Sequence, residues 1–197
     1  MKNTEMQSIK NRIKKLSYGS AFVVSDFTDI ASYENAKKCL LRLEKDQIIR
    51  RVLRGVYDKP FYSQLIGEYS FPNIEEVAAA IARNYNRIIA PSGIAALNLL
   101  GLSTQVSNTY EYYSSGQYKN YTVGKIIISF KHKSSKELLN FSYKSSLVIQ
   151  AIKEIGPNID EETITRIRNH LNLKEKERLL KEASETTKWV YEIVKKI

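Results

Sequence analysis

The chain has very little of the residues that build metal and covalent sites. Its 197 residues include a single cysteine, Cys39, and only two histidines, His132 and His170. One cysteine can form neither an internal disulfide nor a thiolate zinc cluster, and two histidines are too few for a histidine-built metal site. The composition therefore predicts no metal and no disulfide, and it is typical of a protein of the reducing cytoplasm.

Phosphate-binding loops and long apolar runs are also missing. No G-x-x-x-x-G-K-[ST] or G-x-G-x-x-G motif occurs, so we expect no nucleotide cofactor. The apolar run around Ile94–Leu102 is far too short to span a bilayer. The first fifteen residues, MKNTEMQSIKNRIKK, lack the apolar core of a secretory signal. We therefore expect a cytoplasmic protein with no membrane partner.

Positive charge is what the chain has in excess. Its formal net charge is +10, and most of the excess lies in the first two thirds of the sequence. A basic protein without a membrane signal points first to nucleic acid as its partner.

The stretch from Ser32 to Pro60 predicts a helix, a tight corner and a basic hairpin. Ser32 is a good N-cap for a helix that ends near Asp46. The apolar positions of this helix follow helical spacing and predict a core-facing stripe. They are Tyr33, Ala36, Leu40 and Leu43. The opposite side carries Glu34, Asn35, Lys38, Arg42 and Lys45, with Lys37 on its flank. The hairpin that follows contains three arginines, of which Arg54 precedes the Gly55 turn.

An amphipathic helix followed at once by a basic hairpin is typical of a winged helix-turn-helix. Residues 4–16 predict a preceding helix, 21–24 a short strand and 27–31 a short helix, which completes the element order of that fold. In such a domain the helix enters the major groove and the hairpin reaches the backbone or the minor groove. The alternative interpretation is a solvated helix face beside an ordinary sheet edge.

The whole chain is expected to be an α+β protein of two domains. We predict a winged helix domain over residues 1–68, a connector at 61–71, and a mixed domain over residues 69–197. In the second domain, Asn73 and Glu76 form a capping-box-like helix start. Residues 109–133 predict an antiparallel sheet of about three strands, and residues 160–197 predict a helical tail.

The second domain offers little catalytic chemistry, so we expect no enzyme. Ser92 and Gly93 stand at a helix N-terminus that can hold an anion, but a cap and a turn is the more common role of such a start. The tyrosines of the predicted sheet can stack bases of single-stranded nucleic acid or fill a sheet core. A second basic surface is predicted on this sheet and its exit: Lys119, Lys125, Lys131, Lys133 and Lys136.

Several segments together resemble the AbiEi-like antitoxins of bacterial toxin–antitoxin and phage-defence loci. They are LRLEKDQIIRRVLRGVYDKP, IIAPSGIAALNLLGLSTQV, YYSSG and KIIISFKHK, and the most specific of them spans Pro91 to Val106. The resemblance implies an N-terminal winged helix that represses its own operon and a C-terminal antitoxin domain. It also implies a nucleotidyltransferase-like toxin as the functional partner. This chain departs from the pattern in having Gln47 where such corners often have Gly.

We therefore expect a DNA-binding autorepressor and antitoxin that binds double-stranded DNA at its own promoter, at inverted repeats. The predicted DNA-binding residues are Asn35, Lys37, Lys38, Arg42, Lys45, Arg50, Arg51 and Arg54. Two alternatives from other classes stay open. One is an interaction protein whose second domain binds the toxin directly, and the other is an RNA-binding module that uses the tyrosine-rich sheet.

Overall fold

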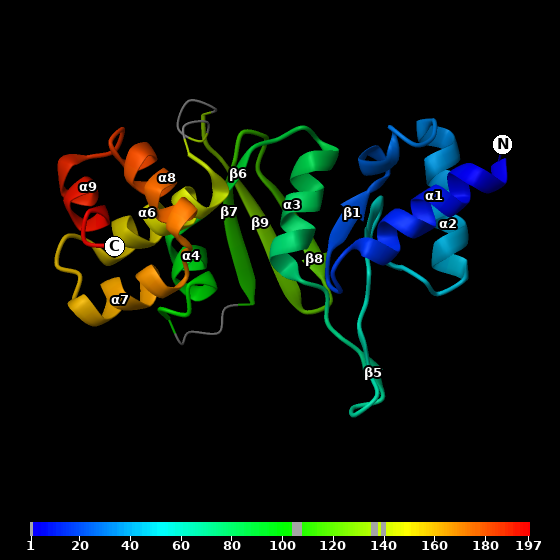
Figure 1. The fold of residues 1–197 in the computed structure, drawn as a ribbon, viewed down its shortest axis with the longest axis horizontal. Helices are drawn as coiled ribbons and strands as arrows, with labels where there is room; N and C mark the ends of the chain where they lie inside the picture. Colours follow the sequence, from blue (N-terminus) through cyan, green and yellow to red (C-terminus); the bar gives the residue numbers. More distant parts are fainter. Residues whose placement is uncertain (1, 104–107, 135–137, 139–140) are drawn as a thin grey trace. The chain divides into compact units, whose positions relative to one another are not determined.

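The computed structural model describes residues 2–103, 108–134, 138 and 141–197. Contacts between residues divide the chain into two compact units, Met1–Arg87 and Ile88–Ile197 (Figure 1). The division falls after Arg87, whereas the sequence places the boundary after residue 68. The segment between these two points contains a helix that packs on the N-terminal unit, which explains the difference. As predicted, the fold is of the mixed α+β kind.

The N-terminal unit combines helices with a small antiparallel sheet. Its sheet has the order β1-β3-β2, and β1 and β2 both pair with β3 in antiparallel register. The elements are α1 (Lys2–Lys15), β1 (Ala21–Val23), the 3-10 helix η1 (Val24–Phe27), α2 (Tyr33–Lys45), β2 (Arg50–Leu53) and β3 (Val56–Asp58). The predicted element order is confirmed. The short helix, however, lies at Val24–Phe27 and not at 27–31.

Helix α2 begins and ends where its sequence indicates. The Ser32 side chain accepts a hydrogen bond from the Asn35 backbone N–H, which satisfies one of the free donors of the first turn. At the other end Gln47 adopts a φ of 56°, in the left-handed region that Gly enters without strain. The Ile48 N–H then donates to the Leu43 carbonyl at 2.9 Å, which closes the helix. Gln47 thus forms the corner without a glycine.

The core of the N-terminal unit lies between α1, α2 and the sheet. Its fully buried side chains include Ile9 and Ile13 of α1 and Leu40 and Leu43 of α2, and the two leucines are buried as predicted. The prediction for Tyr33 is wrong, because half of this residue is exposed. The buried residues of α2 are Ala36, Cys39, Leu40 and Leu43, and they form one continuous arc on the helical wheel. Tyr33 lies at the edge of that arc.

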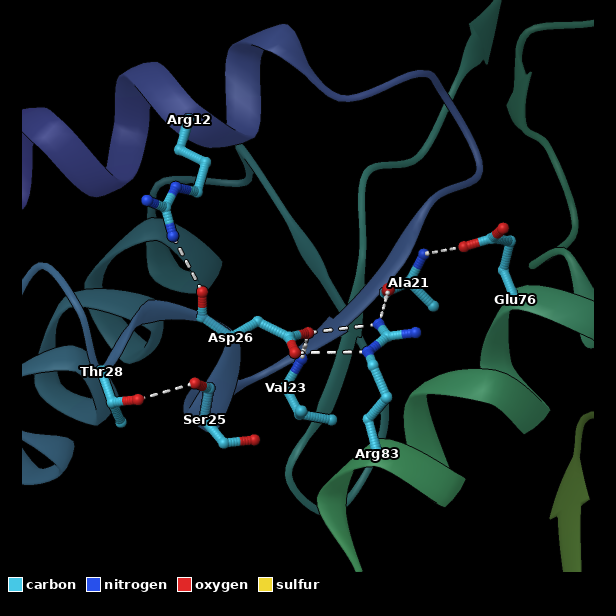
Figure 2. Close-up of polar contacts among 8 residues, drawn as sticks. All are labelled: Arg12, Ala21, Val23, Ser25, Asp26, Thr28, Glu76 and Arg83. Carbon is cyan, nitrogen blue, oxygen red and sulfur yellow. Dashed lines mark hydrogen bonds and ion pairs between the residues drawn. The ribbon is translucent and has the colours of Figure 1, made fainter. Parts of the chain in front are cut away.

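Helix α3 (Ile74–Asn84) is attached to β1 and η1 by side chains at both of its ends. Figure 2 shows the Arg83 guanidinium directed at the Asp26 carboxylate, with its Nε 3.2 Å from Oδ1, and it also donates to the Ala21 carbonyl at 2.9 Å. Near the start of α3, Asn73 caps the Glu76 N–H as predicted. The Glu76 carboxylate itself accepts from the Ala21 N–H at 3.4 Å. These contacts place α3 in the N-terminal unit.

The predicted connector at 61–71 is a second hairpin. Strands β4 (Tyr62–Ser63) and β5 (Glu68–Tyr69) pair antiparallel and join no other sheet. We call residues 61–71 the arm. It extends from the rest of the N-terminal unit, at the label β5 in Figure 1. The sequence did not indicate this hairpin because each strand is only two residues long.

The sheet of the C-terminal unit has four strands in the order β6-β7-β9-β8. The strands are β6 (Ile89–Pro91), β7 (Thr109–Ser114), β8 (Lys119–Val123) and β9 (Ile126–His132). The antiparallel prediction holds for β8 with β9. Strand β6, which the predicted sheet did not include, pairs antiparallel with β7. It is wrong for β7 and β9, which are parallel. The β8–β9 hairpin turns at Gly124, and its strand β9 lies between β7 and β8, so the chain reaches the outer strand before the inner one.

Five described helices surround the hydrophobic core of this unit. They are α4 (Gly93–Leu99), α6 (Tyr143–Ile155), α7 (Glu161–Asn169), α8 (Leu173–Ala183) and α9 (Lys188–Val194). The predicted tail is thus three separate helices, which begin after the caps Asp160, Asn172 and Thr187. Their apolar faces and those of α4 and α6 enclose one cluster of buried side chains, which includes the fully buried Ile149 and Ile152.

Glu182 connects α8 to the start of α6. Its carboxylate accepts hydrogen bonds from the Ser142 backbone N–H at 2.8 Å, from the Ser142 hydroxyl and from the Arg178 guanidinium. Burial alone raises the pKa of Glu182, but the bonds from Ser145, Arg178 and Ser142 outweigh it and lower this pKa to about 2.

Among the described residues, no helix combines the length and apolarity needed to cross a membrane.

Candidate nucleic-acid interface

The exposed face of α2 contains a group of cations. Lys37, Lys38, Arg42 and Lys45 are all exposed, and within the described part of the chain none of them forms an ion pair with a carboxylate. They lie on the side of the helix that its buried arc leaves to solvent. The fold therefore brings four of the predicted DNA-binding residues together on one surface with their charges free.

Asn35 differs from these four cations. It is half-buried, and its side-chain amide donates to the Glu5 carboxylate of α1 at 3.3 Å. A hollow of about 290 Å³ opens beside this contact, lined by Glu5, Asn35, Lys38, Cys39 and Arg42. Burial raises the pKa of the Cys39 thiol, so this residue is a small apolar wall of the hollow. The structure thus gives Asn35 a partner within the protein.

Arg50 of β2 is also engaged inside the protein. Its Nε donates to Asp58 Oδ1 at 3.0 Å, a second bond joins the other guanidinium nitrogen to Oδ2, and Nη1 donates to the Ser70 carbonyl at 2.8 Å. Asp58 is completely buried, so this forked pair neutralises a carboxylate that has no access to water. Arg50 was predicted to bind DNA, but the structure uses it to hold the hairpin together and to fix the end of the arm.

Arg51 and Arg54 are the exposed arginines of the β2–β3 hairpin. Arg54 occupies the turn itself, where Gly55 adopts a φ of 81° that favours glycine. Arg51 lies on β2 opposite Tyr57 and lines a hollow beside the end of α2. Of the three arginines in the hairpin, only Arg54 stands at its tip.

The predicted second basic surface is not assembled on one face. Residues paired across strands share a face, and Lys119 pairs with Phe130, so Lys119 and Lys131 point to opposite sides of the sheet. Lys125 lies in the turn at the other end of the β8–β9 hairpin. Lys136 lies outside the described residues.

Two of these lysines also have partners on the sheet. Lys131 Nζ lies 2.6 Å from the Glu111 carboxylate, whose hydrogen bond raises the pKa of Lys131. Lys133 Nζ lies 3.8 Å from the centre of the Tyr113 ring, in a cation–π contact. The lysines of the sheet are therefore dispersed. Two of them, Lys131 and Lys133, already interact with side chains of this chain.

Some tyrosines of the sheet pack in its core and others are exposed. Tyr112 is fully buried and Tyr121 half-buried, and both rings pack against Phe130, with centroids 5.9 and 5.8 Å away. Tyr118 is well exposed, in the connection before β8. Core packing thus occupies the rings of Tyr112 and Tyr121, and the arrangement gives little support to a base-stacking platform.

The Pro91-Ser92-Gly93 turn is occupied by the protein itself. The buried Ser92 caps the Ala95 N–H, and a Cβ added at Gly93 would collide with the Glu154 carboxylate of α6. A carboxylate thus already stands at the start of α4, so a cap and a close helix contact explain the motif. Residues 104–107, at the end of the segment most specific to the resemblance, lie outside the described residues.

Sequence reasoning missed two features of the N-terminal unit. Tyr33 and Leu41 are exposed among the α2 cations, with 50% and 38% of their surface free. The arm exposes several further apolar side chains. Apolar spacing assigns such residues to a core, so only the exact position of the buried arc could have revealed them. Within the described ranges, no cluster of His, Cys, Asp and Glu could hold a metal ion.

Comparison with known proteins gives a family without an assigned activity. A search of curated proteins gave no match. The model of a family of unknown function, DUF6088, matches residues 8–179, which is most of the chain. The protein is therefore a member of the DUF6088 family.

Proposed function

We propose that this protein is a DNA-binding regulator whose N-terminal unit acts as a winged helix. The observation that carries the proposal is the exposed face of α2, where Lys37, Lys38, Arg42 and Lys45 lie together and form no ion pair with any carboxylate that the structure describes. Helix α2 is followed directly by the β2–β3 hairpin, and the sheet order β1-β3-β2 is the one that a winged helix requires. A surface of this kind attracts the phosphates of a duplex.

The size and chemistry of α2 suit the major groove. Its thirteen residues extend about 20 Å at 1.5 Å per residue, and the major groove is about 12 Å wide. The cations at the edges of the exposed face would bind phosphates on either side of the groove. Leu41 lies between them, and an apolar side chain at this position suits contact with a thymine methyl group.

The hairpin contributes one clear contact. Arg54 at its turn is exposed and free to reach the sugar–phosphate backbone or the minor groove. Arg50 stabilises the hairpin from within through Asp58. The proposed footprint therefore consists of five cations: Lys37, Lys38, Arg42, Lys45 and Arg54.

The biological role that we propose is autoregulation of a toxin–antitoxin operon. It rests on the resemblance to AbiEi-like antitoxins, in which a regulator of this kind is encoded beside a nucleotidyltransferase-like toxin. In this role the protein binds inverted repeats in its own promoter and also counteracts the toxin. A neighbouring gene for a nucleotidyltransferase, and growth rescue when the two genes are expressed together, test this part separately from DNA binding.

Fluorescence anisotropy with the duplex immediately upstream of the gene tests the DNA interface. Five neutralised phosphates predict a slope of about −4 to −5 for log K against log salt concentration. Lys38→Ala/Arg42→Ala should weaken binding by about ten- to a hundredfold. The matched control is Lys174→Ala/Lys181→Ala, which removes two exposed lysines from α8 and should leave the affinity unchanged. Affinity that is indifferent to salt, or equal losses in both variants, would refute the interface.

A further inference from the structure

Exposed large apolar side chains are concentrated in the arm. Leu65 is 98% exposed and Ile66 72% exposed, and these two residues form the tip. Four aromatic side chains of the arm are about half-exposed as well: Phe61, Tyr62, Tyr69 and Phe71. Water-exposed apolar clusters of this kind mark interaction surfaces in folded proteins. The arm therefore presents its side chains to a partner.

Backbone geometry holds this tip away from its own unit. Tyr62 pairs with Tyr69 and Ser63 with Glu68, so the chain turns between them through residues 64–67. Gly67 adopts a φ of 73° in that turn. The two tyrosine rings meet edge to face with centroids 5.1 Å apart, which stiffens the hairpin. An isolated pair of strands is only marginally stable in water, and both of its outer edges are free for pairing.

A hollow of about 390 Å³ lies at the base of the arm. It is lined by Glu44, Gln47, Ile49, Arg50, Arg51, Pro60 and Tyr69. The antiparallel register of the arm keeps its own tip at the opposite end of the hairpin from Tyr69, so the arm does not fill this hollow with its own tip. Arg51 has no ion-pair partner among the residues that the structure describes, whereas Arg50 is neutralised by Asp58. The hollow thus offers apolar walls, the Arg51 cation and, also in its lining, the Glu44 carboxylate.

The charge of the arm indicates what fits this hollow. Residues 61–71 contain no Lys or Arg, and Glu68 is their only charged side chain at neutral pH. An arm that grips DNA or an anionic membrane carries cations, because both partners are polyanions. An apolar tip followed by a carboxylate instead complements the apolar walls of the hollow, and its Glu68 complements Arg51 in particular. The same chain carries both halves of this match.

We propose that the arm docks into the hollow of a second copy of this chain. Because arm and hollow adjoin on one unit, a two-fold axis lets each copy insert its arm into the other, which gives a closed dimer. Leu65 and Ile66 then pack on Ile49, Pro60 and Tyr69 of the second copy, and Glu68 lies against its Arg51. The proposal does not depend on the proposed function, since it concerns the free protein.

Sedimentation velocity of the full chain, across a wide range of protein concentration and without DNA, tests this dimer. The wild-type protein should sediment as a dimer that dissociates on dilution. Leu65→Ser/Ile66→Ser should raise the dimer dissociation constant by at least about a hundredfold, because four apolar side chains lose their burial. The matched control is Leu173→Ser, which changes a leucine of α8 that is 78% exposed, and it should behave as the wild type.

A charge exchange makes the test specific to the proposed contact. Arg51→Glu and Glu68→Arg should each weaken the dimer, because each places like charges together, and the double variant should restore it. A wild-type protein that stays monomeric at every concentration overturns the proposal. So does a dimer that is insensitive to the tip variant. Tip variants that keep the same mass but lose affinity for DNA or for anionic vesicles would also overturn it, and would assign the arm to that partner.

Discussion

The α2 surface of the N-terminal unit and the β7–β9 sheet of the C-terminal unit contain similar numbers of cations in very different states. On α2 the four cations share one exposed face and have no carboxylate partners in the described part of the chain. On the sheet, Lys119 and Lys131 lie on opposite faces, Lys131 is paired with Glu111, and Lys133 covers Tyr113. A count of basic residues does not separate these two regions, whereas their geometry does. Free charge gathered on one face is what an anionic partner responds to.

Arg50 sharpens the comparison, because it is a cation of the basic hairpin that is not free. Arg50→Ala leaves the buried Asp58 carboxylate without its partner and should lower the free energy of unfolding by about 3 kcal/mol or more. Arg54→Ala, at the exposed turn, should leave this free energy unchanged. Urea denaturation of the two variants checks both expectations. Equal stability of Arg50→Ala and the wild type would show that Arg50 is available to DNA after all.

Charge reversal on α2 should produce the next largest effect. Lys38→Glu/Arg42→Glu should weaken binding of the upstream duplex by about a hundredfold or more, because two attractive contacts become repulsive. Lys125→Glu/Lys153→Glu lowers the formal net charge by the same amount, from +10 to +6, in the C-terminal unit. Anisotropy titrations of the two doubles at one salt concentration separate local contact from overall charge. If both lose the same affinity, the comparison fails and only total charge matters.

Acid should affect the C-terminal unit through Glu182. Its pKa of about 2 lies below the ordinary value of 4.5 for a glutamate, so its contribution to stability is complete above pH 5 and is lost as the pH falls toward 2. That contribution is at most about 3 kcal/mol. Glu182→Gln should be less stable than the wild type at pH 7 and should change less between pH 5 and pH 3.

Urea midpoints at several pH values measure this difference. Glu177→Gln is the matched control, since Glu177 is an exposed glutamate of the same helix. An identical pH profile for Glu182→Gln and the wild type would contradict the role of this carboxylate at the start of α6.

The smallest effect is expected at the sheet lysines. Lys131→Ala/Lys133→Ala removes one exposed ion pair and one cation–π contact, and it should change neither duplex affinity nor the urea midpoint measurably. Growth rescue from the cognate toxin should likewise be unchanged. Lost rescue with intact DNA binding would instead place antitoxicity on this sheet and would remove the contrast with α2.

Local signals predicted much of the N-terminal unit. Ser32 marks the start of α2, the spacing of Ala36, Leu40 and Leu43 marks its buried side, and Gly55 marks the hairpin turn. Each of these features depends on residues a few positions apart, so it can be read from the sequence. The four α2 cations follow from the same periodicity, since they occupy the positions that the apolar stripe leaves free.

Long-range partners account for what the sequence did not predict. Nothing near Arg50 shows that it pairs with a buried Asp58, or that Arg83 and Glu76 attach α3 to the first sheet. The parallel pairing of β7 with β9 likewise depends on which strand the chain reaches first. The arm escaped prediction for another reason, since apolar residues in a connector normally indicate burial and here they are exposed.

Methylation interference on the upstream duplex tests most directly whether α2 reads the major groove. Dimethyl sulfate modifies guanine N7, which faces the major groove, and adenine N3, which faces the minor groove. We predict that N7 methylation blocks binding at discrete guanines, and that this pattern weakens in Lys38→Ala/Arg42→Ala. Interference confined to adenine N3, or a pattern unchanged in that variant, would contradict the placement of α2 in the major groove.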